Sequence, residues 1–157
     1  MLSVADRLML SDLVHRYAAC VDARRFDDVA QLFTDTAELI VPDPPRQLDP
    51  VIRHTGQESV RTAVHALAGT IRTQHAIVGE IYTAAVQEGR ATGAIAGVAH
   101  HWISRQEQFT DVVWYLRYAD EYQQEGSGWR LLRRSLSIDA IETRPVRQVR
   151  SQGVLQE

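Results

Sequence analysis

An abrupt change of hydrophobic period near residue 70 constrains the fold of this chain more than any other feature of its sequence. From there to residue 140, apolar and polar residues alternate, as they do in strands with one buried face. Strands are predicted at residues 71–86, 91–105, 109–125 and 129–140. The short segments EGR, RQEQ and EGSG between them predict antiparallel pairing, so the C-terminal half forms a sheet.

The N-terminal half follows a helical pattern instead. Ser3 and Asp6 resemble a capping box, and the apolar residues after them recur at helical spacing, which predicts an amphipathic helix at about residues 4–22. A shorter helix is predicted in RFDDVAQLF. Thr55 and Glu58 form a second capping-box pattern, which predicts the start of a third helix.

One short strand, AELIV, is predicted between the second and third helices. It is expected to stop at PDPPRQLDP, because proline lacks the N–H group that continues a ladder. Three helices packed on a mainly antiparallel sheet give an α+β fold, and a curved sheet closed on one side by helices leaves a hollow for a ligand. One domain is predicted at residues 1–143, followed by a polar, flexible tail at residues 144–157.

Composition excludes several classes of partner and chemistry. With 157 residues, 45% of them hydrophobic, the chain can bury a core that holds a pocket. The net charge of −3 lacks the basic excess of nucleic-acid binding proteins, and no apolar run predicts a membrane span or a signal peptide, so we expect a cytoplasmic protein. The single Cys20 allows no internal disulfide, and the absence of lysine excludes Schiff-base chemistry.

Four titratable side chains are predicted to face the apolar side of their elements. His75, in TQHAIVG, shares a strand face with Ile81, and Arg134 alternates with leucines in WRLLRRSLSIDAI. Tyr17 falls within the apolar stripe of the first helix. Asp22 lies at the border of that stripe in the last helical turn, where the helix dipole disfavours a carboxylate.

Each of these residues also has a structural interpretation. A lone strand histidine is often a core residue, an arginine among leucines can reach an interface, and Asp22 could be a solvated helix end. Together in one cavity, however, Asp22 could orient His75 as a general base. Tyr17 and Arg134 could then stabilise an oxyanion or a leaving group, which suits proton abstraction from carbon.

His100 and His101 lie side by side in GVAHHW and point to opposite sides of their strand. At most one of them can therefore reach the cavity of His75. Neither HxH nor HxxxH spacing occurs near them, so we predict neither a metal site nor a cofactor.

Several of these segments, taken in order, resemble the SnoaL-like branch of the nuclear transport factor 2-like superfamily, and its scytalone dehydratase group. They are RYAACVDARRFDDVAQLFTDTAEL, TQHAIVG, GVAHHW and RYADEYQQEGSGWRLLRRS. The resemblance covers residues 5–142 and implies a cone-shaped α+β barrel, in which a curved mixed sheet and three helices enclose a pocket.

The resemblance also implies roles for individual residues. It matches Asp22 and His75 to a catalytic pair, Tyr17 and Arg134 to active-site residues, and His100 to the second histidine of scytalone dehydratase. Val21 stands where that enzyme has a tyrosine, so scytalone itself is not the expected substrate.

The expected function is a cofactor-independent lyase, a dehydratase acting on an apolar cyclic molecule such as a steroid or polyketide. Two alternatives remain open: a double-bond isomerase or polyketide cyclase with the same pocket, and a ligand-binding or interaction domain without activity. A homo-oligomer, trimer or dimer, is also expected from the resemblance.

Overall fold

The computed structural model describes residues 1–152 and contains three α-helices, a short 3-10 helix and six strands. The helices are α1 (Val4–Asp22), α2 (Phe26–Gln31), α3 (Gln57–His65) and the 3-10 helix η1 (Ala66–Gly69). The strands are β1 (Phe33–Asp43), β2 (Gln47–Thr55), β3 (Arg72–Ala84), β4 (Arg90–Arg105), β5 (Gln108–Glu125) and β6 (Gly128–Val146). All four predicted C-terminal strands are present.

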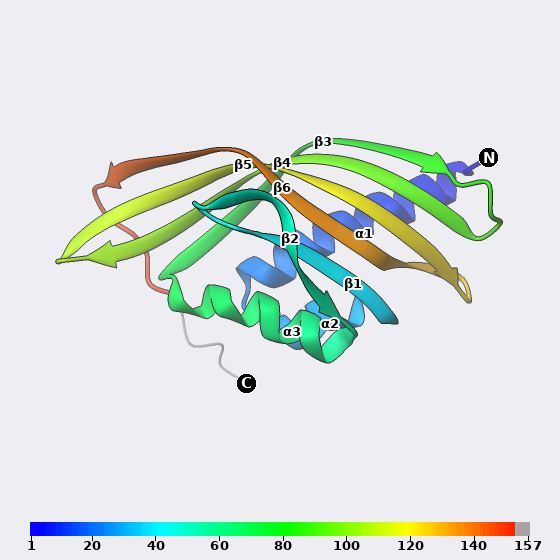
Figure 1. Ribbon diagram of the computed structural model, residues 1–157, viewed down its shortest axis with the longest axis horizontal. Helices are drawn as coiled ribbons and strands as arrows, with labels where there is room; N and C mark the ends of the chain where they lie inside the picture. Colours follow the sequence, from blue (N-terminus) through cyan, green and yellow to red (C-terminus); the bar gives the residue numbers. More distant parts are fainter. Residues whose placement is uncertain (153–157) are drawn as a thin grey trace.

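The six strands form one mixed sheet in the order β2-β1-β6-β5-β4-β3. β1 runs parallel to β6, and every other neighbouring pair is antiparallel. Figure 1 shows the sheet arching over the three helices, so its concave face is covered while its convex face is open. The predicted α+β fold with a curved mixed sheet is confirmed; the sheet is not closed into a complete barrel.

The first helix begins and ends where the sequence predicts. Ser3 Oγ accepts the backbone N–H of Asp6 at 3.1 Å, and the Asp6 carboxylate accepts the backbone N–H of Ser3 at 2.9 Å, so the capping box is present. The buried stripe of α1 packs against β3 and β6. Arg24, just after the helix, has a φ of +62° and turns the chain toward α2.

The capping box predicted at Thr55 and Glu58 is wrong. Thr55 is the last residue of β2, and the N-cap of α3 is Gly56, which caps no N–H with a side chain. Gly56 has a φ of +83°, a conformation that favours glycine, and its N–H donates to Ala37 O at 2.8 Å. The turn between β2 and α3 is therefore set by backbone geometry.

The proline-rich segment contains a strand that the sequence analysis missed. β2 pairs with β1 as an antiparallel hairpin, with Ile52 opposite Val41. Its Pro50 is tolerated because β2 lies at the edge of the sheet, where an absent N–H breaks no central ladder. Prolines therefore shape this hairpin rather than exclude it.

Ile81 was predicted to share a strand face with His75, and a bulge in β3 makes this prediction wrong. Pairing with β4 shifts between Ile77 and Gly79, which leaves Val78 as the extra residue. Beyond the bulge the two faces exchange, so Ile81 is 69% exposed while Tyr82 is buried. His75 therefore lies on the concave face, and Ile81 on the convex one.

The last strand passes the predicted domain boundary at residue 143, because β6 continues to Val146, which pairs with Phe109. Residues 147–152 then lie beside the start of β3, where the Arg72 guanidinium donates to the carbonyl of Ser151 at 3.2 Å. The rest of the predicted tail, residues 153–157, lies outside the described residues.

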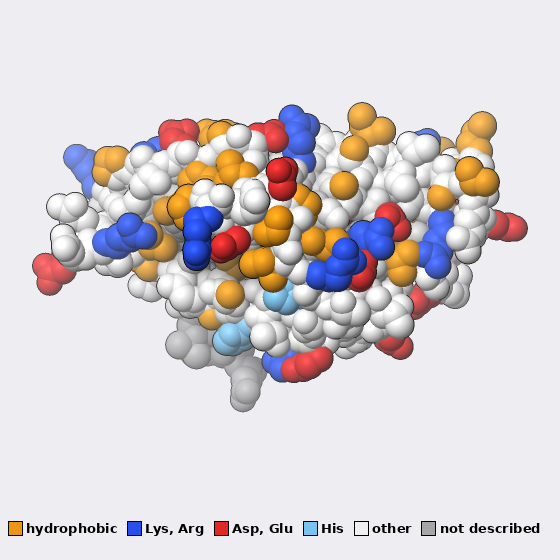
Figure 2. All heavy atoms as spheres, in the orientation of Figure 1, with side chains coloured by type: hydrophobic (Ala, Val, Ile, Leu, Met, Phe, Trp, Pro, Cys, Tyr) orange, Lys and Arg blue, Asp and Glu red, His pale blue; other side chains and the backbone are white. Residues whose placement is uncertain are grey.

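Within residues 1–152, no helix has both the length and the apolar character of a membrane span. Figure 2 shows basic and acidic side chains interspersed over the face it draws. This mixed distribution agrees with the net charge of −3.

Candidate active site

A cavity of about 380 Å³ lies between the concave face of the sheet and the helices. Most side chains around it are apolar, and the polar ones come from α1, α3, β2, β3, β4 and β5. The lining residues that carry chemistry are Tyr17, His54, His75, His101 and Tyr118. A cavity of this size and character can hold a small, largely apolar molecule.

Asp22 and His75, the two residues predicted to form a pair, are in contact. His75 Nδ1 lies 2.7 Å from Asp22 Oδ1, and the backbone N–H of His75 donates to Oδ2 at 2.8 Å. The hydroxyl of Thr73 donates to Oδ1 at 2.9 Å. Because the carboxylate accepts the Nδ1 proton, the neutral ring keeps its lone pair on Nε2.

These hydrogen bonds decide the charge of Asp22. Burial of the carboxylate favours its protonated form, but the bonds from the His75 ring and backbone and from Thr73 outweigh burial and lower the pKa of Asp22. Asp22 is therefore ionised at neutral pH. The same hydrogen bonds also offset the unfavourable position of this carboxylate at the C-terminal end of α1.

Of the two adjacent histidines, His101 lines the cavity and His100 does not. The His101 ring centroid lies 5.9 Å from that of His75 and 4.4 Å from that of Trp114. Burial lowers the pKa of His101 to about 4, so the ring is neutral at pH 7. Its Nδ1–H donates to Val112 O at 2.9 Å, which leaves Nε2 as an acceptor.

The prediction that His100 belongs to the site is wrong, because its side chain lies on the opposite face of β4. There His100 Nδ1 lies 2.7 Å from Asp111 Oδ2, and its ring stacks on Trp102 with centroids 5.6 Å apart. The strict alternation of side chains along β4 places His101 inward and His100 outward.

Arg134 is fully buried and does not line the cavity. Its Nε and Nη2 donate to the two oxygens of Asp120 at 2.9 and 2.6 Å. Its Cζ lies 4.2 Å from the ring centroid of Tyr17 and 4.1 Å from that of Tyr118. In contact with two tyrosine rings that border the cavity and lie edge to face with each other, Arg134 is placed to hold these rings rather than to touch a ligand.

The tyrosines beside Arg134 remain protonated. Burial raises the pKa of Tyr17 and of Tyr118, although the charge of Arg134 opposes this shift. Both side chains reach the cavity, so each hydroxyl can donate a hydrogen bond to a ligand. Sequence reasoning found Tyr17 from the apolar stripe of α1 but missed Tyr118.

No cluster suited to a metal ion is present in the described part of the chain. A metal site needs three or more converging His, Cys, Asp or Glu side chains, and residues 1–152 contain no such group. The polar groups that line the cavity include imidazole rings and phenol hydroxyls, beside aromatic and aliphatic surfaces.

The model of the SnoaL-like domain family matches residues 3–135. The chain belongs to the SnoaL-like family. This match spans α1 through the first part of β6 and includes the residues that line the cavity, except Leu136. Among curated protein sequences, none matches this SnoaL-like protein significantly.

Solved structures share the SnoaL-like fold over nearly the whole chain. A Novosphingobium aromaticivorans structure named as a candidate scytalone dehydratase is 15% identical, with a TM-score of 0.73, covering 98% of this chain and 96% of its own. The Kribbella flavida protein Kfla4162 is 25% identical, with a TM-score of 0.72 and coverages of 88% and 93%. A type 2 hexachlorocyclohexane dehydrochlorinase is 16% identical, with a TM-score of 0.73 and coverages of 93% and 92%.

Proposed function

We propose that this SnoaL-like protein is a lyase that removes water from an apolar cyclic molecule, such as a steroid or a polyketide. The supporting observation is the 2.7 Å contact between Asp22 and His75 at the wall of a cavity of about 380 Å³. Side chains alone can carry the proton transfers of such a reaction. The cavity's apolar lining favours a substrate with few polar groups.

His75 acts as the general base in this proposal. Its Nε2 takes a proton from a carbon next to a carbonyl group, and the electrons of that C–H bond form the new C=C bond as the C–O bond breaks. The imidazolium then returns the proton to the departing oxygen, which leaves as water. Asp22 fixes the tautomer of His75 and stabilises its positive charge.

The tyrosines stabilise the charge that develops on the substrate. The Tyr17 hydroxyl, kept protonated by burial, donates a hydrogen bond to the substrate carbonyl as it gains negative charge. Arg134 is a positioning residue here, because it contacts the rings of Tyr17 and Tyr118 and bonds to Asp120.

The names of two structural neighbours favour an elimination. One is named as a candidate scytalone dehydratase and another as a hexachlorocyclohexane dehydrochlorinase. Loss of water and loss of hydrogen chloride both begin with removal of a proton from carbon, which is the step we assign to His75.

A screen of hydroxylated steroids and cyclic ketols tests the proposal, with loss of water followed by mass spectrometry in deuterated buffer. Conversion to a dehydrated product supports it. Incorporation of deuterium with retention of the oxygen would identify a double-bond isomerase instead. Binding without either change would indicate a ligand-binding domain.

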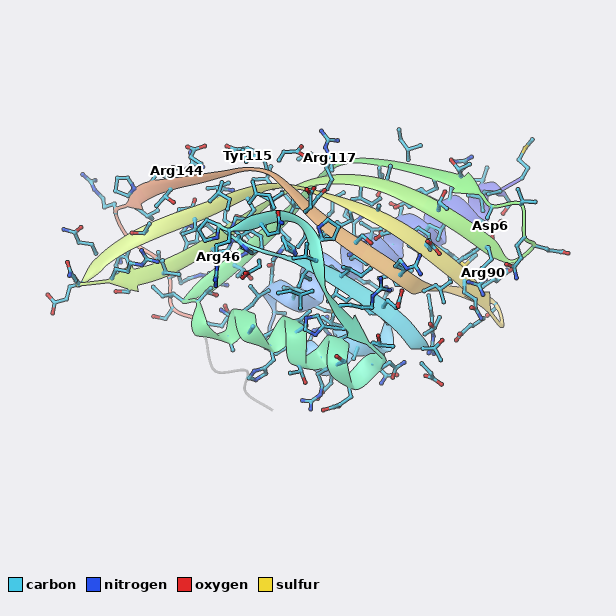
Figure 3. All side chains as sticks on the ribbon, viewed as in Figure 1. Asp6, Arg46, Arg90, Tyr115, Arg117 and Arg144 are labelled. Carbon is cyan, nitrogen blue, oxygen red and sulfur yellow. The ribbon has the colours of Figure 1, made fainter. Side chains whose placement is uncertain are left out.

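We also propose that two or three copies associate through the convex face of the sheet. Figure 3 shows Tyr115 and Arg117 along this outer side, and a shallow groove there is lined by small or apolar residues such as Ala94, Ala96 and Ile81. Exchange of the exposed Ile81 for Glu is expected to shift the protein from oligomer to monomer in sedimentation, whereas exchange of the exposed Val86 for Glu is not.

A further inference from the structure

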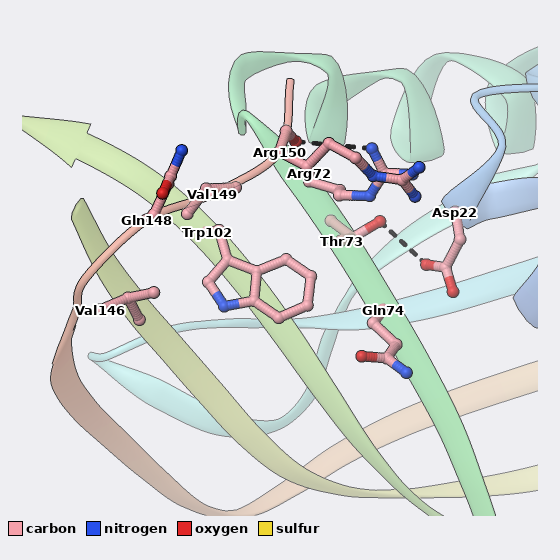
Figure 4. A pocket seen from close by; sticks show the side chains of 9 residues that line it. All are labelled: Asp22, Arg72, Thr73, Gln74, Trp102, Val146, Gln148, Val149 and Arg150. Carbon is pink, nitrogen blue, oxygen red and sulfur yellow. Dashed lines mark hydrogen bonds between the residues drawn. The ribbon is translucent and has the colours of Figure 1, made fainter. Parts of the chain in front are cut away.

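Asp22 separates two hollows of different character. His75 lines the apolar cavity but not the second hollow, whereas Asp22 lines the second hollow but not the cavity. The second hollow has a volume of about 510 Å³ and is shown in Figure 4. We call it the polar pocket, and its lining residues are Asp22, Arg72, Thr73, Gln74, Trp102, Val146, Gln148, Val149 and Arg150.

Positive charge dominates the polar pocket. Arg72 and Arg150 both line it, and within residues 1–152 no carboxylate lies within ion-pair distance of either guanidinium group. Arg72 donates instead to the carbonyls of Arg150 and Ser151, at 3.5 and 3.2 Å. Two cations that line one pocket repel each other, and a bound anion would relieve that repulsion.

A third arginine adds to this field from outside the pocket. Burial lowers the pKa of Arg24, and the charge of Arg72 lowers it further, while Asp22 opposes the shift. Among the described residues, Asp22 is the only one with a carboxylate that lines the pocket, and the protons of His75 and Thr73 already bind its oxygens. The guanidinium groups are therefore the charges that a ligand in the pocket would meet.

The rest of the lining suits an organic anion better than an inorganic one. Trp102 presents an indole surface, and Val146 and Val149 extend the apolar wall beside it. Figure 4 draws Trp102 on one side of the pocket, with Arg72 and Arg150 on another. A planar guanidinium pairs with the two oxygens of a carboxylate, and an indole face packs against an aromatic ring.

We propose that the polar pocket is a second ligand site that binds an aromatic carboxylate, its oxygens between Arg72 and Arg150 and its ring against Trp102. Binding at this site does not depend on catalysis in the cavity. Because Asp22 lines the polar pocket and bonds to His75, which lines the cavity, the ligand's charge also acts on the Asp22 and His75 pair, and that regulatory effect rests on the proposed function.

Calorimetric titration of the full chain with benzoate, benzyl alcohol and inorganic phosphate tests the ligand class. Benzoate is expected to bind, and the uncharged alcohol at least about 10-fold more weakly, because it forms no charge-assisted bond. Phosphate binding as tightly as benzoate would overturn the assignment to an organic anion. Absence of benzoate binding would overturn the site itself.

Variants locate the guanidinium groups that bind the anion. Arg150→Gln is expected to weaken benzoate binding by about 10-fold or more, and it keeps the backbone carbonyl that Arg72 contacts. Arg72→Gln should weaken binding by a similar factor. Arg90→Gln is the matched control. Figure 3 shows Arg90 at one end of the sheet and Arg144, two residues before Val146 of the polar pocket, at the other end. An equal loss with all three variants would contradict the proposal.

The three tryptophans provide a readout of position. Trp102 lines the polar pocket, Trp114 lines the cavity, and Trp129 donates its indole N–H to Asp6 far from both. In ¹H–¹⁵N spectra, benzoate is expected to shift the indole signal of Trp102 and leave that of Trp129 unchanged. A shift of Trp114 without Trp102 would place the ligand in the cavity and overturn the second site.

Discussion

The two faces of the sheet carry the same two kinds of charged pair in different surroundings. The concave face has an Asp–His pair, Asp22 with His75, and the convex face has Asp111 with His100. In both, the carboxylate oxygen lies 2.7 Å from Nδ1 of the ring. The contact itself therefore does not distinguish a candidate catalytic pair from a structural one.

The surroundings of the two histidines do distinguish them. His75 borders a cavity of about 380 Å³, whereas His100 stacks on Trp102 and lines neither of the two hollows described above. Both oxygens of Asp22 accept hydrogen bonds, but Asp111 Oδ1 is buried without a partner among the described residues. The Asp22 and His75 pair therefore differs in two ways: it borders a cavity that can hold a substrate, and both of its carboxylate oxygens accept hydrogen bonds.

The Asp–Arg pairs repeat this contrast. Both side chains of the Arg134 and Asp120 pair are 0% exposed, whereas Arg117 and Asp139, 2.8 Å apart on the convex side, are 63% and 49% exposed. Water screens the outer pair, but the inner charges depend on each other and on the aromatic rings around them. The same kind of ion pair is thus buried on the concave face and exposed to solvent on the convex face.

Removing one charge from each Asp–His pair gives the largest expected difference. Asp22→Asn should lower kcat/KM by about 10³-fold or more, because the amide no longer fixes the tautomer of His75 or stabilises its charge. Asp111→Asn should change it by less than about three-fold, since His100 lies on the other face. Turnover of a substrate found in the screen is the measurement, with the melting temperature as a control for folding. Equal losses would remove the catalytic role of Asp22.

Breaking the two Asp–Arg pairs compares their contributions to stability. Arg134→Met leaves Asp120 buried and unpaired, so the free energy of unfolding should fall by about 3–5 kcal/mol in urea denaturation. Arg117→Met should cost less than about 1 kcal/mol, as exposed pairs do. The double variant Asp120→Asn/Arg134→Met should regain part of the loss. A similar cost for both single variants would contradict the contrast between the faces.

Burial of the His101 ring should make the folded protein sensitive to acid. His101 has a pKa of about 4 in the folded protein, below that of an unfolded histidine, so only the unfolded chain gains this proton as the pH falls from about 6.5 to 4. Stability should therefore decrease over this window, by up to about 3 kcal/mol from this group.

His101→Gln should remove most of that pH dependence, because no buried imidazole is then kept neutral. Exchange of His100 for Gln, on the convex face, should retain it. Unfolding in urea at several pH values measures both slopes. A steep slope that survives in His101→Gln would show that other groups cause the acid sensitivity.

The smallest expected effect concerns the Thr73 hydroxyl, which binds the carboxylate of the Asp22 and His75 pair. Thr73 is buried and donates to Asp22 Oδ1, so Thr73→Val should lower turnover by about 5- to 10-fold through loss of one hydrogen bond to a charged group. Thr73→Ser keeps the hydroxyl and should retain most of the activity. If the two variants behaved alike, the loss would come from packing and not from positioning of Asp22.

Local patterns identified Asp22 and His75 as candidates, and the family resemblance implied that they form a pair. The helical stripe and capping box of α1 place Asp22 at its last turn, and the alternation in β3 places His75 on the concave face. Both signals depend on residues close in sequence. The position of Ile81 failed because a one-residue bulge at Val78 leaves no mark in the hydrophobic pattern.

Other parts of the site depend on contacts that the sequence does not display. The inward residues just before His101 are small. At Gly97, for example, an added Cβ would lie 3.1 Å from the Leu116 side chain. Small residues give a weak hydrophobic pattern, so the sequence does not show which of the two histidines faces inward. Asp120 lies opposite Arg134 only through the register between β5 and β6. Such pairing is set by the whole sheet.

The two irregular strands also decide where the sheet stops. β2 and β3 are its outermost strands, and an open edge invites pairing with a strand of another molecule. Pro50 interrupts the donors along β2, and the bulge at Val78 bends β3 away from regular pairing. Pro50 and the bulge at Val78, which made β2 and the faces of β3 hard to predict, thus protect the folded protein from edge-to-edge aggregation.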